Sequence, residues 1–233
     1  AADFEAAMSE VGAISGASAQ DLATLTAKAK EMGATTSFSA SESAEAMKYM
    51  AMAGWETADM TAGIAGIMNL AAAAGEDLGT TSDIVTDGLT AFGMSAKESG
   101  RFADVMAAAS TNANTNVTML GESFKYCAAT AGAMGYNIED ISVALGVMAN
   151  AGIKGSTAGT TLKNVIANMA KPTDAQAAVM QKLGISLTDS SGNMKSFAEV
   201  MNNLRTSFNG LSETEKASYA TTLAGKESMS GLL

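Results

Sequence analysis

Two pairs of neighbouring carboxylates are the residues of this sequence that most resemble the machinery of an acid–base catalyst. They are Glu76-Asp77 and Glu139-Asp140, and an acid and a base of this kind can protonate and deprotonate a substrate. Neither pair has a companion group that would complete a catalytic site, and the absence of His excludes Ser-His-Asp and Cys-His catalysis. Both pairs precede apolar segments of helical period, where acidic side chains stabilise the positive end of the helix dipole. We therefore interpret them as helix-start residues, and the sequence predicts a protein that is not an enzyme.

The segment GIKGST, residues 152–157, contains the residue types of a phosphate-binding loop. A P-loop requires Gly-Lys-Ser/Thr at the start of a helix that follows a buried strand, and here the order differs and no strand is predicted to precede it. We expect instead a tight turn capped by Ser156 or Thr157. Because the chain has a single cysteine, Cys127, and no His, zinc and most transition-metal sites are excluded as well. The sequence predicts no cofactor and no metal.

The composition favours closely packed helices. Of the 233 residues, 47% are hydrophobic, yet aromatic residues make up only 5%, and the chain has 17 Met, 23 Gly and one Pro. Small side chains let helices approach closely, flexible Met fills irregular gaps, and a scarcity of Pro leaves helices uninterrupted. The net charge of −10 argues against nucleic-acid binding, which requires clustered Lys and Arg. The most apolar stretch, residues 64–74, is shorter than the roughly 20 residues of a membrane-spanning helix.

Apolar residues recur at spacings of three and four along most of the chain, which predicts a series of amphipathic helices. On the stretch around residue 124, Glu122, Ser123 and Lys125 are expected on the polar face. We interpret the apolar stripes as core. They consist of Met60, Ile64, Ile67 and Ala71; Phe102, Val105, Met106 and Ala109; Leu120, Phe124, Cys127, Ala131 and Met134; and Ile138, Ile141, Leu145 and Met148.

A recurring Gly-apolar pair marks the expected helix ends. Gly adopts the left-handed conformation after a helix, and the following apolar residue folds back on the last turn, as in a Schellman motif. Thr57, Ser95 and Asn137 stand where the next helix needs an N-cap. The pairs are Gly54-Trp55, Gly93-Met94, Gly135-Tyr136, Gly152-Ile153 and Gly184-Ile185. Capping boxes are predicted for Ser39 with Glu42, Ser95 with Glu98, Thr173 with Gln176 and Ser212 with Glu215.

One segment departs from helical periodicity. Residues 185–188 alternate apolar and polar, turn residues follow at 189–193, and we expect a small β-hairpin or extended turn near 185–195. Asp189 and Asn193 lack the further ligands and the terminal Glu of an EF-hand, so a plain turn is favoured over a calcium loop.

The predicted fold class is all-α. Because the expected helices are capped and separated by Gly turns, a single continuous helical rod, which would be about 350 Å long, is disfavoured. We expect a compact bundle of about nine to eleven short helices, or stacked helical hairpins joined by Gly turns. The Gly turns recur without a fixed spacing. The sequence therefore leaves two explanations open: true sequence repeats, or helix–turn–helix units that are alike without being repeats.

Several segments, in order, carry a family resemblance. The stretch MANAGIKGSTAGTTL, residues 148–162, resembles the signature of the core domain of phage tail tape measure proteins. The other matching segments are FSASESAEA (38–46), MAGW (52–55), LAAAAGEDL (70–78), FADVMAAA (102–109), SFKY (123–126), AMGYNIED (133–140) and AKPT (170–173). The resemblance covers residues 35–175, with a weaker continuation at 184–194. It implies N-terminal helices at 1–34 leading into a tape measure core at 35–175, followed by C-terminal helices with the short hairpin at 176–233, either separate from the core or continuous with it. The long heptad-rich stretches expected of a full tape measure protein are absent here.

The resemblance implies a structural role in the virion. A tape measure core domain would help nucleate tail tube assembly and set tail length, and would leave the tube during genome delivery. The implied partners are the tail tube protein, tail assembly chaperones, baseplate or tail tip proteins and copies of the chain itself, without nucleic-acid-specific binding. Membrane contact would be a property of the parent protein only. The implied location is the tail tube lumen of the virion, and the host bacterial cytoplasm during assembly. The signature and turn positions are Gly54, Trp55, Gly135, Tyr136, Gly152, Ile153, Lys154, Gly155, Ser156 and Gly159.

Two other classes of function remain as alternatives. Helices rich in Ala, Gly and Met can rearrange into bilayers, as in a membrane-active pore-forming or injection protein. A helical cell-wall hydrolase would need a carboxylate in an apolar cleft, and Glu122 beside the apolar stripe is the residue that comes nearest to this requirement. Leu120 and Phe124 explain that helix without any catalytic role.

Overall fold

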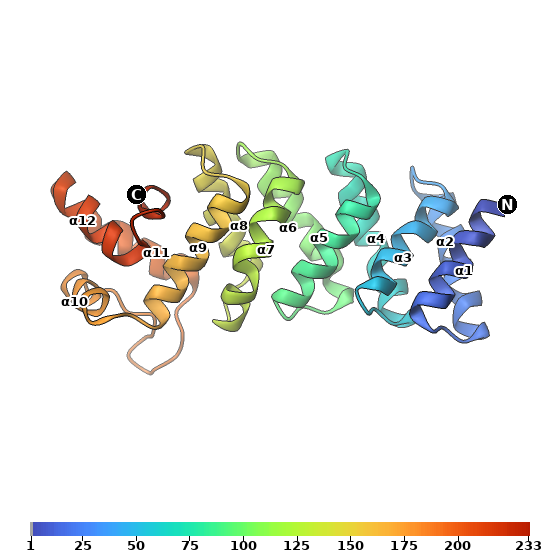
Figure 1. Ribbon diagram of the computed structural model, residues 1–233, viewed down its shortest axis with the longest axis horizontal. Helices are drawn as coiled ribbons and strands as arrows, with labels where there is room; N and C mark the ends of the chain where they lie inside the picture. The colour runs from blue at the N-terminus through green and yellow to red at the C-terminus, as the bar shows by residue number, and fades with distance from the viewer. Residues whose placement is uncertain (1) are drawn as a thin grey trace. The chain divides into compact units, whose positions relative to one another are not determined.

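The computed structural model describes residues 2–233, and its regular elements are helices (Figure 1). The first part of the chain forms α1 (Ala2–Ser15), α2 (Ala19–Thr35), α3 (Ala40–Met52), α4 (Thr57–Ala74), α5 (Leu78–Ala91), the 3-10 helix η1 (Ala96–Glu98) and α6 (Ser99–Asn112). There follow α7 (Val117–Ala133), α8 (Ile138–Asn150), α9 (Gly155–Ala170), α10 (Asp174–Leu183), α11 (Phe197–Phe208), α12 (Glu213–Ala224) and α13 (Met229–Leu232). The all-α prediction is confirmed for the described residues.

Five helix ends close in the same way. In each, the apolar residue after a Gly of positive φ donates its backbone N–H to a carbonyl oxygen five residues earlier, as Trp55 does to Met50 at 3.0 Å. This 6→1 bond satisfies a carbonyl that the helix end would otherwise leave free. The Schellman prediction is confirmed at Gly54-Trp55, Gly93-Met94, Gly135-Tyr136, Gly152-Ile153 and Gly184-Ile185.

The helix starts follow the predicted chemistry at most sites. All four expected capping boxes are present, including Ser39 with Glu42, and Asn137 caps α8 by accepting from the backbone N–H of Asp140 at 2.7 Å. Ser95 precedes η1 as predicted. The prediction for Thr57 was wrong by one position, because Glu56 is the N-cap of α4 and makes no side-chain capping bond there.

The chain divides into two compact units, and the division falls inside α7. The first unit comprises the described residues up to Thr111 together with Asn116–Gly121, and the second comprises Asn112–Thr115 with Glu122–Leu233. The division differs from the boundaries near 35 and 175 that the resemblance suggested, which concern sequence similarity and remain a prediction.

In the first unit, helices pack against neighbours one and two places along the chain. Helix α3 contacts α1, α2, α4 and α5, and α4 contacts α2, α5 and η1 (Figure 1). Small residues allow this close packing: a Cβ on Gly88 would lie 2.3 Å from the ring of Phe102, and one on Gly66 would lie 2.5 Å from Ser99. The stripe on α4 is buried as predicted, whereas on α6 Phe102 and Met106 are buried and Val105 and Ala109 are half-buried.

The second unit has its own apolar core. The core draws on α9, α10, α11 and α12 and on the segment after α10. Its buried members are Val165, Met169, Met180, Leu183, Ile185, Val200, Leu204, Phe208, Ala220, Leu223 and Ala224. The predicted stripe on α8 is buried in full, and so is the stripe on α7 except for the half-buried Met134.

The predicted helix count needs correction, and the segment near 185–195 takes one of its two expected forms. The described residues form 13 α-helices and one 3-10 helix, more than the expected nine to eleven. One of them, the four-residue α13, is too short for an apolar period to be recognised in the sequence. Of the two expected forms, a β-hairpin and an extended turn, the structure has the extended turn. It contains a single isolated antiparallel bridge, Thr188 with Met194, and residues 2–233 contain no β-strand. The segment is too short, and too exposed beyond Leu187, to bury the face that would stabilise a hairpin.

Candidate functional site

The signature turn, residues 148–159, joins α8 to α9. Gly152 has φ +86°, and Ile153 donates its backbone N–H to the carbonyl oxygen of Met148 at 2.9 Å. Lys154 is the N-cap residue and makes no side-chain capping bond. The expectation that Ser156 or Thr157 caps the turn was therefore wrong, because α9 begins at Gly155 and both residues lie within its first turn.

The N-terminal turn of α9 lies directly against α7. The hydroxyl of Ser123 donates to the carbonyl oxygen of Gly155 at 2.9 Å, and both residues are buried. A Cβ on Gly159 would lie 2.2 Å from the carbonyl oxygen of Ser123, and a Cβ on Gly155 would lie 2.8 Å from Oε2 of Glu122. At Gly159 only glycine allows this approach of two backbones. The contact at Gly155 is with the end of a flexible side chain, and there the positive φ of +57° is what favours glycine.

Ser123 corrects a sequence prediction. It was assigned to the polar face of its helix with Glu122 and Lys125, which are indeed exposed, but Ser123 itself is 2% exposed. The signal that could have identified it is the pair of glycines on α9, because small residues spaced by four mark a face prepared for close approach by another helix.

The earlier signature positions lie at other turns. Trp55 follows Gly54 in the first unit, and a Cβ on Gly63 would lie 2.3 Å from the Trp55 ring, so the indole covers the backbone of α4. In the second unit, the ring of Tyr136 meets that of Phe197 edge to face at a centroid distance of 5.2 Å. Burial raises the pKa of the Tyr136 hydroxyl.

The signature residues are thus packing and turn positions of separate helix ends. The structure brings Gly155 and Gly159 together with Ser123, and it brings Tyr136 together with Phe197. Gly54 and Trp55 belong to the first unit and the other signature residues to the second. Their role as sites therefore remains a prediction.

The carboxylates occupy helix starts, as predicted. Asp77 caps α5 by accepting from the backbone N–H of Thr80 at 2.8 Å, and this bond holds the pKa of its carboxyl below the ordinary value. Asp140 accepts from the backbone N–H of Ala198 at the start of α11 at 3.0 Å. Glu122 is exposed, so it does not lie in the apolar cleft that a hydrolytic carboxylate needs.

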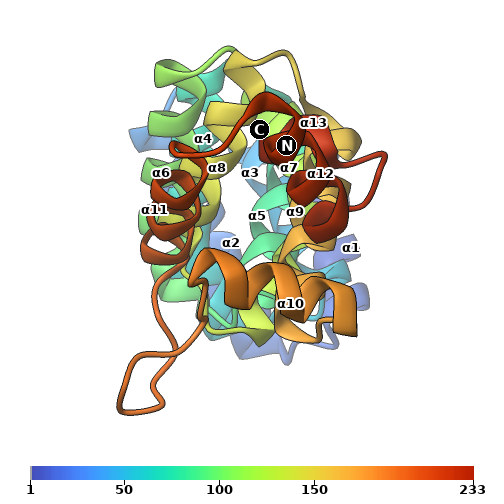
Figure 2. The ribbon, with the colours of Figure 1, turned by 90° about the vertical axis from the view of Figure 1, so that its left-hand side faces the viewer.

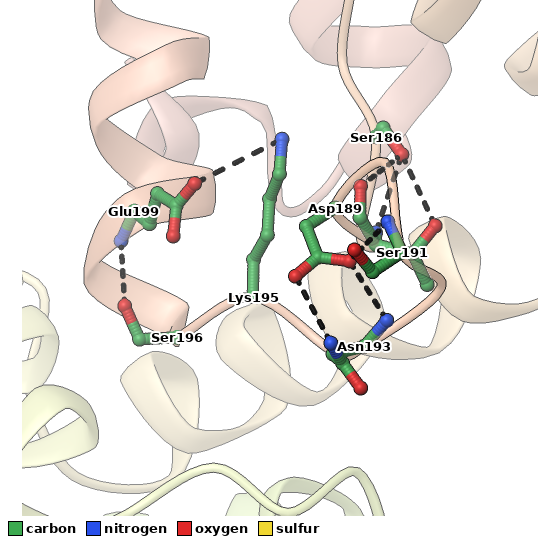
Figure 3. Close-up of polar contacts among 8 residues, drawn as sticks. Ser186, Asp189, Ser191, Asn193, Lys195, Ser196 and Glu199 are labelled. Carbon is green, nitrogen blue, oxygen red and sulfur yellow. Dashed lines mark hydrogen bonds and ion pairs between the residues drawn. The ribbon is translucent and has the colours of Figure 1, made fainter.

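The extended turn after α10 is closed by a single carboxylate (Figure 3). Oδ1 of Asp189 accepts from the backbone N–H groups of Ser191 and Asn193 at 2.8 and 2.9 Å, and Oδ2 accepts from the Asn193 side chain at 3.2 Å. These bonds lower the pKa of Asp189. Because the loop's own donors occupy both oxygens, the carboxylate acts as a turn-forming group, in line with the plain turn that the sequence predicts.

One feature of the second unit was not anticipated from the sequence. A groove of about 620 Å³ lies among α8, α9, α11 and α13 and is lined mainly by apolar side chains. Among residues 2–233 there is no group of three or more His, Cys, Asp or Glu side chains that could hold a metal ion. No helix in this described part of the chain is long and apolar enough to cross a membrane.

Comparison with known proteins places these features in context. Residues 26–225 match the family model described as phage-related minor tail protein. The chain is 40% identical over 231 residues to the tape measure protein of Pneumococcus phage Dp-1, covering 99% of this chain and 20% of that protein. It is 25% identical over 232 residues to the probable tape measure protein of Escherichia phage P2, covering 98% of this chain and 28% of that protein. No solved structure matches significantly.

Proposed function

Because this chain belongs to the phage-related minor tail protein family and is similar along nearly its whole length to tape measure proteins, we propose that it is a tape measure core domain that nucleates tail tube assembly and contributes to tail length. A structural role in phage tails follows from the family. The observation that carries the finer proposal is the 40% identity to a tape measure protein over 99% of the chain. The chain spans about a fifth and just over a quarter of the two relatives' lengths.

The helical architecture supports a structural role over a catalytic one. The carboxylates that were candidates for chemistry serve as helix caps and turn closures, as at Asp77 and Asp189. The signature glycines serve close packing between α7 and α9. These features build closely packed helices, which suit a protein around which other subunits assemble.

The folded state also defines what kind of ruler this region can be. A continuous helix of this length would extend about 350 Å at 1.5 Å per residue, whereas none of the helices exceeds the 18 residues of α4 among the described residues. As a folded core, the region contributes far less length per residue than a rod. The proposal therefore gives it mainly the nucleating role, with the main measuring portion elsewhere in a longer protein.

The partners proposed for this role are the tail tube protein, tail assembly chaperones, baseplate or tail tip proteins and copies of the chain itself. The proposed location is the tail tube lumen, reached from the host cytoplasm during assembly, and the proposed fate is release during genome delivery. The net charge of −10 supports a lumen protein that does not hold the passing DNA. The pore-forming alternative gains no support from the helices, because none in the described chain is a membrane-span candidate.

An in-frame deletion and an in-frame duplication of residues 35–175 in the phage gene test the proposal. Electron microscopy of the resulting lysates should show few or no tails for the deletion. For the duplication it should show tails lengthened by much less than the roughly 210 Å that 141 helical residues would add as a rod. Tails of unchanged length and number in the deletion would overturn the proposal. If the duplication lengthened the tails by the full increment of roughly 210 Å expected of a rod, this region itself would measure tail length.

A further inference from the structure

The groove of the second unit is lined by residues of four helices. These helices are α8, α9, α11 and α13. Helices α8 and α11 contact each other, and Figure 2 shows them side by side. The apolar lining consists of Val143, Ala144, Val147, Met148, Leu162, Val165, Phe197, Met201, Leu204, Phe208, Leu232 and Leu233.

The outer face of α8 is the exposed part of this surface. Val143 is 67% exposed and Val147 is 65% exposed, and they are the most exposed large hydrophobic side chains among residues 2–233. They lie four residues apart, so they form a stripe on one helix face together with Ala144. Such i, i+4 pairs are the anchors by which a helix enters an apolar groove, and here anchor and groove are adjacent.

The charges at the groove have an opposite sign at each end. Asp140, in the first turn of α8, accepts from the backbone N–H of Ala198 in the first turn of α11, so the two helices start together. Arg205 lies seven residues beyond Ala198, about 10 Å farther along α11 at 1.5 Å per residue. Arg205 forms no ion pair with another residue in the described range 2–233. The groove thus has an acid, Asp140, at one end and a base without an ion pair, Arg205, farther along. The other base of the lining, Lys216, is paired with Glu213 at 2.8 Å.

We propose that this surface is a two-fold interface between two copies of the chain. With the α8 helices antiparallel, the valine stripe of each copy covers the groove of the other, and Asp140 of each copy meets Arg205 of the other. A two-fold axis requires a self-complementary surface, and opposite charges at the two ends of one apolar groove satisfy that requirement. The local pairing also matters because two chains of net charge −10 otherwise repel each other.

The inference deepens the self-association proposed above and rests on that proposal for its meaning in the tail. Its test concerns the purified chain alone. A monomeric chain would overturn the interface and leave the deletion phenotype untouched, so the two failures are distinguishable.

Sedimentation velocity over a concentration series is the first experiment. The chain should associate into dimers, and Val147→Asp should weaken the dimer by at least about tenfold, since a buried charge replaces an apolar anchor. The matched control is Met52→Asp, which places the same charge at a side chain 63% exposed in the first unit and should leave association unchanged. A wild-type chain that stays monomeric, or a Val147→Asp dimer as strong as wild type, would overturn the interface.

A charge exchange tests the pairing itself. Asp140→Lys and Arg205→Glu should each dimerise at least about tenfold more weakly than wild type, because each homodimer then opposes like charges twice. An equimolar mixture of the two variants should dimerise again, because every contact in the mixed dimer joins opposite charges. Circular dichroism of each variant shows whether it is folded. This control is needed because an unfolded variant would fail to associate in the mixture for a reason unrelated to the charge pairing. Two folded variants that do not associate with each other would refute the proposed pairing.

Cysteine cross-linking locates the axis. Ala144 lies between the two charged ends, so Ala144→Cys should cross-link to its own copy under mild oxidation, whereas Met52→Cys should not. The native Cys127 does not interfere, because it is fully buried. A dimer that forms without cross-linking at residue 144 would mean that the chain uses another face, which would overturn the proposal. The proposal would equally be overturned if the chain bound lipid vesicles and did not dimerise.

Discussion

The hydroxyl of Ser123 donates a 2.9 Å hydrogen bond to the carbonyl oxygen of Gly155, joining the middle of α7 to the first residue of α9. In the first turn of a helix the backbone N–H groups are free, whereas the carbonyl oxygens accept hydrogen bonds from the next turn. The carbonyl oxygen of Gly155 therefore accepts the bond from Ser123 in addition to the bonding expected within its own helix. The close approach of α7 to α9 depends on Gly159, where a Cβ would meet the backbone of Ser123. A serine on an apolar helix face and two glycines on the next helix thus specify one contact.

Substituting Gly159 with Ala should destabilise the second unit by about 1–3 kcal/mol, as other substitutions that overpack a core do. The added Cβ would lie 2.2 Å from the backbone carbonyl oxygen of Ser123, which cannot rotate away as a side chain would. Urea unfolding followed by circular dichroism measures the change.

Gly100→Ala is the matched control for this prediction. A Cβ on Gly100, in α6, would meet no atom within 4 Å, and the residue has no positive φ. Alanine should therefore stabilise by about 0.5–1 kcal/mol through helix propensity. Equal effects of the two substitutions would contradict the close approach of α7 and α9.

The buried thiol of Cys127 should make stability depend on pH in the alkaline range. Burial raises the pKa of this thiol to about 12 from an ordinary value of 9.0. Below the ordinary value the thiol is protonated in both states and costs nothing. Above it the unfolded state ionises first, so the free energy of unfolding falls by up to about 1.4 kcal/mol per pH unit until the folded pKa is reached.

Urea unfolding of wild type and Cys127→Ala between pH 7 and 10.5 isolates this contribution. The wild-type advantage over the variant should shrink as the pH rises above about 9, because the variant lacks the titrating group. In the native state the thiol should also resist a thiol reagent that labels it rapidly in denaturant. A constant difference between the two proteins across this range would refute the assignment.

Local patterns predicted the helices and their ends because each depends on neighbouring residues. A Gly followed by an apolar residue encodes the Schellman turn at Gly54-Trp55, and Ser39 with Glu42 encodes a capping box. The period of apolar residues placed Ile64 and Phe124 in the core. Such signals lie within one helix or one turn, so a single sequence carries them in full.

Contacts between distant segments were beyond these patterns. The burial of Ser123 depends on α9, more than thirty residues away, and its polar side chain argued for the exposed face. The sequence left a β-hairpin and an extended turn open at 185–195, and the hydrogen bonds of the exposed Asp189 close the segment as a turn. The groove joins side chains from α8, α9, α11 and α13, which no local period relates. The family resemblance was confirmed because it rests on the order of many segments.

The N-cap of α5 should contribute to stability in a pH-dependent way. The pKa of Asp77 is held below its ordinary value chiefly by the backbone N–H of Thr80. The stabilisation is present above the unfolded pKa of about 3.9 and is lost as the pH falls through the folded pKa. Asp77→Ala should cost about 1 kcal/mol at neutral pH.

Asp77→Asn separates capping from charge, because the amide oxygen still accepts the bond but does not titrate. It should retain most of the stability at pH 7 and lose less than wild type between pH 5 and 3. Acid unfolding of the three proteins by circular dichroism provides the comparison. If the alanine and asparagine variants were equally unstable at pH 7, the hydrogen bond would not be the stabilising feature.

Asp189 should determine how readily proteases cut the segment between α10 and α11. Its carboxylate accepts from the backbone N–H groups of Ser191 and Asn193. Residues 188–194 are all exposed and lie between the half-buried Leu187 and Lys195. Asp189→Ala removes these acceptors, so the turn opens more often and cleavage within 188–194 should accelerate several-fold. The unfolding midpoint should change little, because the core of the second unit is untouched. The control is Glu199→Ala, which removes only a 3.9 Å ion pair to Lys195 that contributes little at an exposed site. Mass spectrometry of limited digests identifies the cut sites, and equal cleavage rates in the two variants would mean that the bridge at Thr188 and Met194 closes the turn without the carboxylate.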